Sequence, residues 1–197
     1  MTKRLFDLIV SSIALIVLSP LLLVLAVLVK LESPGPALFT QERVGRFGRL
    51  FRIHKFRTMR EGAPVPGYNL TVGRDPRITE LGAFLRRYKL DELPQLFDVF
   101  LGNMSFVGPR PEMSEYVARY PDDVRRQILA VRPGITDPAS IEFRNESALL
   151  ATATDPEKMY IEEILPKKLA SSRRYLKERS LLADIHIIWE TLRSSYR

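Results

Sequence analysis

Hydrophobic residues are concentrated at the start of the chain, where the run from Leu8 to Val29 contains no charged residue. A helix of roughly 20 apolar residues is long enough to cross the core of a bilayer. Ser19 and Pro20 stand near the middle of this run. Because proline inside a helix removes one backbone hydrogen bond and clashes with the preceding turn, the pattern predicts a membrane helix that bends at Ser19 and Pro20.

Basic residues flank the run on both sides, with Lys3 and Arg4 before it and Lys30 after it. Basic flanks tend to stay in the cytoplasm, so a straight crossing would leave one of them on the far side. Each arm of a bent helix, at about 1.5 Å per residue, reaches only to about the midplane of the bilayer. We therefore favour a re-entrant membrane helix over residues 1–32, followed by a cytoplasmic domain over residues 33–197.

The same residues allow two other interpretations of this segment. A single-pass anchor with a proline kink is the plainer one, since such kinks are frequent in membrane helices. A cleaved signal peptide is disfavoured, because the stretch is longer than a secretory one and no small-residue cleavage site follows Val29. In the re-entrant form, we expect the Ser19 hydroxyl to donate to a backbone carbonyl one turn earlier.

The pattern after residue 32 predicts an α/β mixed, mainly helical domain. Residues 37–43 and 50–56 have the composition of two short strands around a glycine-bearing turn at 45–48, which predicts a β-hairpin. Helical periodicity and capping residues indicate helices over 79–88, 91–101, 114–131, 156–179 and 181–196. Residues 61–76, rich in proline and glycine, and residues 106–111 are expected to be loops.

The last of these helices carries an apolar face that includes Trp189, the only tryptophan, and it ends in basic residues. Such amphipathic helices can lie in a membrane interface. A final helix that packs on a globular core shows the same stripe. The fold prediction therefore includes amphipathic interfacial helices, with core packing as the alternative for this one.

Composition and charge narrow the classes of function. The chain has no cysteine, which excludes a disulfide framework or a thiolate metal site. Its net charge is +7, and segment 37–60 holds seven basic residues against the single acidic residue Glu42. This segment is expected to meet something anionic, and lipid headgroups, nucleic acid and a phosphorylated substrate all qualify.

Two adjacent carboxylates, Asp91 and Glu92, stand at the predicted start of a helix. Acidic residues are common there simply because they complement the helix dipole, so a structural role is the alternative. Adjacent side chains in a first turn point in different directions. One carboxylate can therefore attack or accept a proton while its neighbour holds a divalent metal ion.

Arg110 lies between Pro109 and Pro111, whose fixed φ angles hold the backbone on either side. A planar guanidinium suits phosphate oxygens bidentately, whereas a structural ion pair with Asp98 or Glu112 is the plainer explanation. The basic strand 52–59 and residues 75–77 offer further phosphate ligands or merely a solvated face. Neither histidine of the sequence has a partner pattern that indicates metal or acid–base work.

Taken together, these blocks resemble the small monotopic phosphoglycosyl transferases, the bacterial sugar transferase family that starts polyprenol-linked glycan assembly. The similarity covers residues 3–7, 19–20, 33–36, 39–45, 55–59, 75–79, 90–95 and 104–111, in the same order as in the family. The resemblance implies a re-entrant helix bent at Ser19 and Pro20. It also implies a catalytic domain on the cytoplasmic face of the bacterial inner membrane.

The resemblance further implies transfer of a sugar 1-phosphate from a UDP-sugar to undecaprenyl phosphate, with release of UMP, as the first membrane step of surface glycan assembly. By analogy Asp91 is the nucleophile that forms an aspartyl-phosphosugar intermediate, and Glu92 is a catalytic residue that holds Mg²⁺. The implied substrate ligands are Arg110, Lys55, Arg57, Arg77 and Arg144. The implied partners are the two substrates and membrane lipids, without nucleic acid, and a homodimer is compatible with this picture.

One block departs from the family. After residues 133–136 many relatives continue with a sequence of the kind Gly-Trp-Ala-Gln-Val-Asn-Gly-Arg, whereas residues 137–146 differ here. The role of Arg144 and the identity of the sugar are therefore the least determined points. A membrane-anchored nucleic-acid-binding or regulatory protein that uses residues 43–60 is the alternative function, but it gives Asp91 and Glu92 no role. The intact carboxylate pair also argues against a non-catalytic scaffold.

Overall fold

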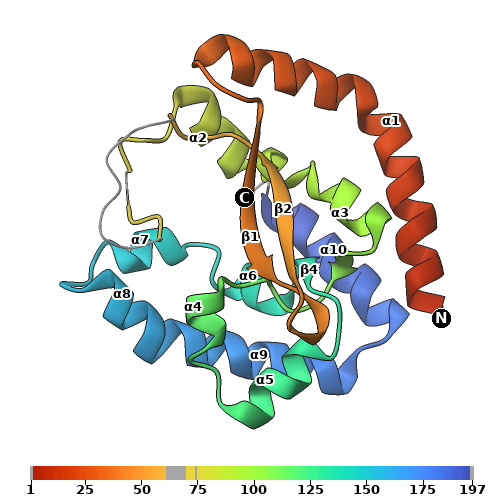
Figure 1. Cartoon of the computed structure of the whole chain (residues 1–197), viewed down its shortest axis with the longest axis vertical. Helices are drawn as coiled ribbons and strands as arrows, with labels where there is room; N and C mark the ends of the chain where they lie inside the picture. Colours follow the sequence, from red (N-terminus) through yellow and green to blue (C-terminus); the bar gives the residue numbers. More distant parts are fainter. Residues whose placement is uncertain (1, 61–69, 74, 196–197) are drawn as a thin grey trace.

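The computed structural model describes residues 2–60, 70–73 and 75–195. A long helix, α1 (Thr2–Glu32), begins the chain and curves around one side of a mainly helical domain (Figure 1). In that view α1 rises from the N-terminus and then turns across the top of the molecule. The predicted mainly helical fold, with one long apolar N-terminal helix and a small hairpin, is confirmed.

Large apolar side chains cover the outer surface of α1. Ile16, Val17 and Leu23 are 74%, 67% and 67% exposed, whereas only Asp7, Ser11, Leu25 and Val29 are buried on the inner side. Within the described part of the chain, α1 alone is long and apolar enough to cross a membrane. An exposed apolar surface of this extent indicates contact with lipid or with another protein.

The helix continues through Pro20. Proline has no N–H, so the carbonyl of Ile16, four residues earlier, loses its usual donor. The Ser19 hydroxyl donates to this carbonyl at 2.8 Å and replaces the missing bond. The hydrogen bond expected of Ser19 is therefore present, while the re-entrant course through a bilayer stays a prediction.

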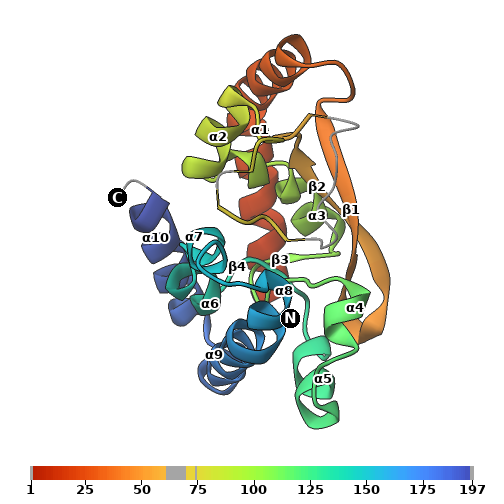
Figure 2. The ribbon, with the colours of Figure 1, turned by 90° about the vertical axis from the view of Figure 1, so that its left-hand side faces the viewer.

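The predicted hairpin is confirmed. Strands β1 (Leu38–Val44) and β2 (Leu50–Phe56) pair antiparallel, with Leu38 opposite Phe56 and Val44 opposite Leu50. The short turn η1 (Arg46–Gly48) joins them. Figure 2 shows the hairpin along one edge of the molecule, opposite helices α2 (Glu80–Arg87) and α10 (Leu181–Ser195).

A second pair of strands was not predicted. β3 (Ser105–Val107) pairs parallel with β4 (Gly134–Thr136), although residues 106–111 were expected to be a loop. Three-residue strands are too short to show periodicity. The two strands approach so closely that a Cβ on Gly134 would lie 2.1 Å from the Gly108 nitrogen.

The helical segments mostly agree with the predicted ranges, with local differences. The predicted helix 114–131 is divided before Pro121, and the predicted helix 91–101 begins with a 3-10 turn. Within the atypical segment 137–146 lies the short helix α6, and the short helix α7 begins at its last residue. The remaining elements are η2 (Leu90–Glu92), α3 (Gln95–Leu101), α4 (Ser114–Val117), α5 (Asp122–Leu129), α6 (Pro138–Glu142), α7 (Glu146–Leu150), α8 (Pro156–Met159), the π-helical turn η3 (Tyr160–Ile164) and α9 (Leu165–Glu178).

Two apolar clusters organise the domain. The larger one joins α4, α5 and α7 to α9, around the buried rings of Tyr116 and Tyr160. The smaller one joins the second half of α1 to β2 and α2 through Leu25, Val29 and Leu85. Because Leu90 and Leu93 pack against this smaller cluster, turn η2 is held against the helix expected to enter the membrane.

Helix α10 has one face packed on the domain and one face exposed. Asp184 and Ile187 are buried against the domain, so the core-packing alternative is correct for this side. On the other side Leu182 and Trp189 are 79% and 63% exposed. An interfacial location for this outer face stays a prediction.

Candidate active site

The carboxylate pair lies in η2, between α2 and α3. Lys89, with φ 58°, takes the left-handed conformation that starts this turn. Asp91 and Glu92 are both buried, at 8% exposure each. The alternative that these are ordinary first-turn acids on a solvated helix is therefore disfavoured, since charged groups are rarely buried without a specific partner.

Glu92 is held by two cations from distant parts of the chain. Its Oε1 accepts from Lys55 Nζ on β2 at 2.6 Å and from Arg110 on the loop after β3 at 2.8 Å. Burial opposes ionisation of Glu92, but the charges of Arg110, Lys55 and Lys89 prevail and hold the pKa of Glu92 well below its usual value. The side chain is thus a carboxylate at neutral pH.

Asp91 is in a different electrostatic state. Its Oδ1 is buried and has no hydrogen-bond partner among the described residues. Burial and the negative charge of Glu92 raise the pKa of Asp91, while nearby Lys55, Lys89 and Arg86 act in the opposite direction. A desolvated carboxylate oxygen without a donor, surrounded by cations, is available to react with an electrophile that carries negative charge.

Arg110 reaches Glu92 because the β3–β4 pair fixes its loop. Gly108 N donates to Thr136 O and Gly134 N donates to Pro109 O, both at 3.1 Å. The charge of Glu92 raises the pKa of Arg110, so the guanidinium is always ionised. An ion pair of Arg110 with Asp98 or Glu112 was the alternative to phosphate binding, and the structure instead pairs Arg110 with Glu92.

Glu112, two residues after Arg110, anchors the loop from the other side. It accepts from Tyr160 at 2.8 Å and from Arg43 at 3.4 Å, and Lys168 lies 3.8 Å away. These partners come from β1, η3 and α9. Sequence reasoning missed this network, because no local spacing relates residues so far apart in the chain.

Arg86 is a further candidate that sequence reasoning missed. Its Nε donates to Thr58 Oγ1 at 2.8 Å, close enough to the carboxylate pair for electrostatic interaction. Burial lowers the pKa of Arg86, and the charge of Asp91 partly offsets this effect. The sequence signal that could have identified Arg86 was its position at the end of α2, a few residues before the carboxylate pair in η2.

The other predicted ligands take different positions. Arg57 donates to the carbonyls of Ser33 and Pro34, both at 2.6 Å, and so caps the end of α1. Arg77 Nε donates to Asp75 Oδ1 at 2.9 Å, and Arg144 is exposed between α6 and α7. The structure brings Lys55 and Arg110 to the carboxylate pair, while substrate contacts by Arg57, Arg77 and Arg144 stay predictions.

A histidine pair lies outside this constellation. His54 Nδ1 is 2.8 Å from Asp98 Oδ1, and the His54 backbone N–H donates to Asp98 Oδ2 at 3.0 Å. The sequence showed no partner pattern for His54, because Asp98 is 44 residues away along the chain. Asp98 is fully buried. Its carboxylate accepts from the His54 backbone N–H on the edge of β2 that does not face β1, next to Lys55.

The carboxylate pair offers oxygen ligands of the kind that Mg²⁺ prefers. Within residues 2–60, 70–73 and 75–195, no group of three or more His, Cys, Asp or Glu side chains could hold a metal ion. Mg²⁺, however, is usually bound by one or two carboxylates together with waters and substrate phosphates. The ionised Glu92 fits such a shared site, in which waters and substrate phosphates would complete the ligands. The Mg²⁺ assignment stays a prediction.

Known proteins similar to this chain point to one family. The whole chain, residues 1–197, matches the family model of the bacterial sugar transferases. A UDP-N-acetylgalactosamine-undecaprenyl-phosphate N-acetylgalactosaminephosphotransferase of Aeromonas hydrophila is 37% identical over 194 residues. A UDP-glucose:undecaprenyl-phosphate glucose-1-phosphate transferase of Escherichia coli (strain K12) is 36% identical over 193 residues. The exopolysaccharide production protein PSS of Rhizobium leguminosarum bv. phaseoli is 40% identical over 201 residues.

These similarities cover almost all of the chain but different shares of the relatives. The match takes in 98% of this chain and 43% of the Aeromonas protein, and 96% of this chain and 39% of the Escherichia protein. It takes in 96% of this chain and 92% of the Rhizobium protein. The relatives lend no support to the nucleic-acid-binding alternative.

Proposed function

Because the chain belongs to the bacterial sugar transferase family, we propose that it transfers a sugar 1-phosphate from a UDP-sugar to undecaprenyl phosphate and releases UMP. The names of the relatives support undecaprenyl phosphate as acceptor, with glucose or N-acetylgalactosamine as the sugar. The observation that carries the proposal is the buried carboxylate of Asp91, whose Oδ1 has no hydrogen-bond partner among the described residues. It lies next to Glu92, which is held by ion pairs with Lys55 and Arg110.

The reaction proceeds in two displacements. An oxygen of the Asp91 carboxylate attacks the β-phosphorus of the UDP-sugar, the bond from that phosphorus to the bridging oxygen breaks, and UMP leaves with the electron pair. An oxygen of undecaprenyl phosphate then attacks the same phosphorus. The acyl-phosphate bond breaks, which restores the Asp91 carboxylate and yields the diphosphate-linked sugar. Kinetics of the ping-pong type follow.

Attack of one anion on another requires that charge be neutralised. Arg110, Lys55 and Arg86 lie around the carboxylate pair and supply fixed positive charge. Glu92 would hold Mg²⁺, which would supply positive charge to the diphosphate when bound. Burial of the pair excludes water, so these charges act more strongly than they would in solution.

Membrane attachment brings the site to its lipid substrate. A polyprenyl phosphate keeps its phosphate at the headgroup layer, so the carboxylates must be held at that depth. The packing of Leu90 and Leu93 against the second half of α1 supports this placement. We propose that α1 dips into the cytoplasmic leaflet of the bacterial inner membrane and that the outer face of α10 lies in the interface.

The test is a panel of UDP-sugars with undecaprenyl phosphate, with UMP release as the readout. Asp91→Asn is expected to lower turnover by about 10³-fold or more while membrane association is unchanged. Asp122→Asn, an exposed acid on α5, is the matched control and is expected to keep full activity. Incubation with donor alone should add a sugar-phosphate mass to the peptide that contains Asp91.

Wild-type turnover by Asp91→Asn would refute the nucleophile assignment. Rapid product formation without any sugar-phosphate adduct on that peptide would refute the covalent intermediate. Absence of UMP release with every UDP-sugar, from protein that retains its fold, would refute the proposed donor class.

A further inference from the structure

The basic segment 37–60 is only partly explained by the site. Arg43, Lys55 and Arg57 are turned inward to Glu112, Glu92 and the end of α1. Three other arginines of the segment, Arg46, Arg49 and Arg52, are exposed toward the outer end of the hairpin. Residues 46–50, called the hairpin tip below, therefore carry positive charge that the proposed reaction does not use.

The charge at the tip continues toward the first turn of α1. Arg4 donates to the carbonyls of Val99 and Phe100 at 2.6 and 2.8 Å. Arg132 Nε donates to Gly102 O at 2.7 Å. A Cβ on Gly102 would lie 3.1 Å from an Arg4 nitrogen, so Arg4 and Arg132 meet around one residue at the end of α3.

Arg46 extends this row of cations to the hairpin tip. Its Nε donates to Ala130 O at 2.9 Å, two residues before Arg132. Burial, together with the positive charges of Arg4 and Arg46, lowers the pKa of Arg132. Among the residues that the structure describes, none of these three arginines pairs with a carboxylate within 4.0 Å. The row is thus open to an external anion.

Apolar side chains stand beside these cations. Phe47 is 67% exposed and has φ 59°, a conformation that costs a residue other than glycine about 1–2 kcal/mol. The guanidinium of Arg46 lies 4.4 Å from the centre of its ring. Leu50 and Leu101 are 54% and 65% exposed. Exposed apolar side chains next to arginines suit a surface that contacts a lipid interface.

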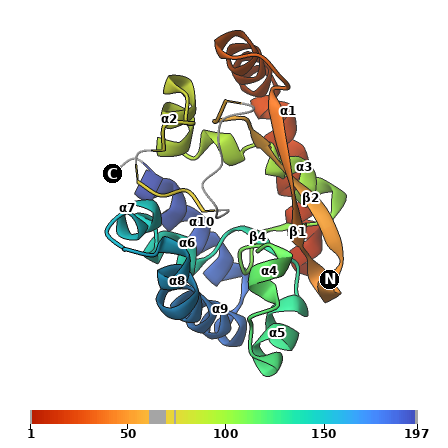
Figure 3. The same cartoon turned by 60° about the vertical axis from the view of Figure 1, so that its left-hand side comes forward.

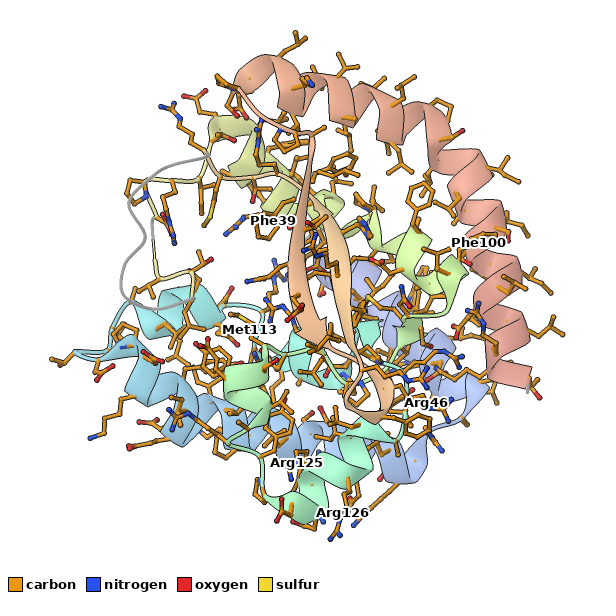
Figure 4. All side chains as sticks on the ribbon, in the orientation of Figure 1. Phe39, Arg46, Phe100, Met113, Arg125 and Arg126 are labelled. Carbon is orange, nitrogen blue, oxygen red and sulfur yellow. The ribbon has the colours of Figure 1, made fainter. Side chains whose placement is uncertain are left out.

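The position of Arg4 sets the depth of this surface. Cations that flank an apolar membrane segment extend to the headgroup layer, and Arg4 lies in the first turn of α1. Figure 4 shows Phe100 beside α1 and Arg46 at the turn of the hairpin, on the same side of the molecule. Since Arg4, Arg132 and Arg46 are neighbours, the hairpin tip stands at the level where α1 leaves the bilayer.

We propose that the hairpin tip, together with Arg132, is a second membrane contact that binds the anionic headgroups of phospholipids. The proposal rests on the proposed insertion of α1 in the membrane. Insertion of α1 fixes the depth of the domain, and contact of the hairpin tip, beside the first turn of α1, also fixes its tilt. The tilt decides where the Asp91 carboxylate lies relative to the headgroup plane.

The test follows the depth of the tip in the full chain. Trp189→Phe removes the only tryptophan, and Phe47→Trp in that background places a fluorophore at the tip. The protein is reconstituted in vesicles of phosphatidylcholine, with or without phosphatidylglycerol, that contain lipid brominated in the acyl chain. We expect quenching that increases with phosphatidylglycerol and decreases with salt. Leu50→Trp is a second reporter in case Phe47→Trp disturbs the turn.

Charge variants test the recognition. Arg46→Gln and Arg49→Gln should each reduce the ratio of membrane-docked to free tip about fivefold, since a basic residue near an anionic surface contributes about 1 kcal/mol. Lys167→Gln is the matched control, because Lys167 is exposed near the start of α9. Figure 3 shows α8 and α9 on the side of the molecule opposite α1 and the hairpin. This control should leave quenching unchanged.

A third reporter separates this proposal from the anchoring of α1. Ile13→Trp, on the exposed face of α1, should be quenched in every vesicle. If Ile13→Trp is quenched but neither tip reporter responds to phosphatidylglycerol, the tip proposal is overturned and the anchor stands. If none is quenched, both are overturned. A tip response to an RNA oligonucleotide, without a response to anionic lipid, would also overturn it.

Discussion

Lys55 and Arg110 together form a clamp around the Glu92 carboxylate, and its strength can be tested with Arg110→Gln. The guanidinium and the carboxylate are 2.8 Å apart, which at an effective dielectric constant of about 20 corresponds to about 6 kcal/mol of gross attraction. Desolvation offsets much of this, and removal of one partner of a buried pair typically costs about 3–5 kcal/mol. Lys55 remains at 2.6 Å and Arg110 keeps 33% of its side chain exposed. We therefore expect destabilisation by about 3 kcal/mol.

The dependence on pH has a defined sign. The pKa of Glu92 is held below its usual value of 4.5, so this stabilisation is complete above the pKa of the unfolded chain. It is lost as pH falls through the lower pKa of the folded protein. Arg110→Gln removes a cation and raises the pKa of Glu92. The stability gap between wild type and variant should therefore be largest near neutral pH and disappear in acid.

The assay is thermal unfolding in detergent micelles over a series of pH values, combined with a double-mutant cycle. Glu92→Gln alone leaves two buried cations without their shared acceptor. The double variant removes the pair together, so its cost should be smaller than the sum of the single costs by about 2 kcal/mol. Additivity within about 0.5 kcal/mol, or a gap that persists unchanged into acid, would refute the clamp.

Three further predictions concern other parts of the molecule. Asp91→Asn removes a negative charge that burial and Glu92 disfavour, and it is expected to stabilise the protein by about 1–3 kcal/mol at neutral pH. Because burial raises the pKa of Asp91, this gain should be present above the pKa of the folded protein and vanish in acid, and thermal unfolding at both pH values checks it. Tyr160→Phe removes the 2.8 Å bond to Glu112 and is expected to cost about 1.5–3 kcal/mol by the same measurement; an unchanged melting temperature would contradict the network. Pro20→Leu restores the donor to Ile16 and should straighten α1, which moves a tag at the N-terminus to the far side of the membrane, as measured by protease protection. A tag that is already periplasmic in the unmodified protein would exclude the re-entrant form.

Part of the site was determined by local sequence signals. The pair Asp91 and Glu92 was recognised because adjacent acids precede an apolar helix, and Arg110 because two prolines flank it. The prediction that these residues converge with Lys55 is supported by the distances to Glu92. Arg86 and Tyr160 were missed, because burial beside a carboxylate depends on elements that meet only in the folded chain.

The sequence by itself determined the elements whose signals are local. The uncharged run with Ser19 and Pro20 specified a long apolar helix, since length and hydropathy are properties of contiguous residues. Glycine between two short strands specified the hairpin for the same reason. No comparable signal exists for β3 and β4, whose three-residue pairing joins segments 27 residues apart or more along the chain and positions Arg110.

Only the tertiary structure decided the use of each cation. Arg43 on β1, Lys55 on β2 and Arg57 just after β2 belong to one basic segment and are equivalent by composition, yet they pair with Glu112, Glu92 and the end of α1. Arg46 keeps its charge exposed at the tip. The physical reason is that an ion pair depends on distance and desolvation, and both are set by packing between segments remote in sequence.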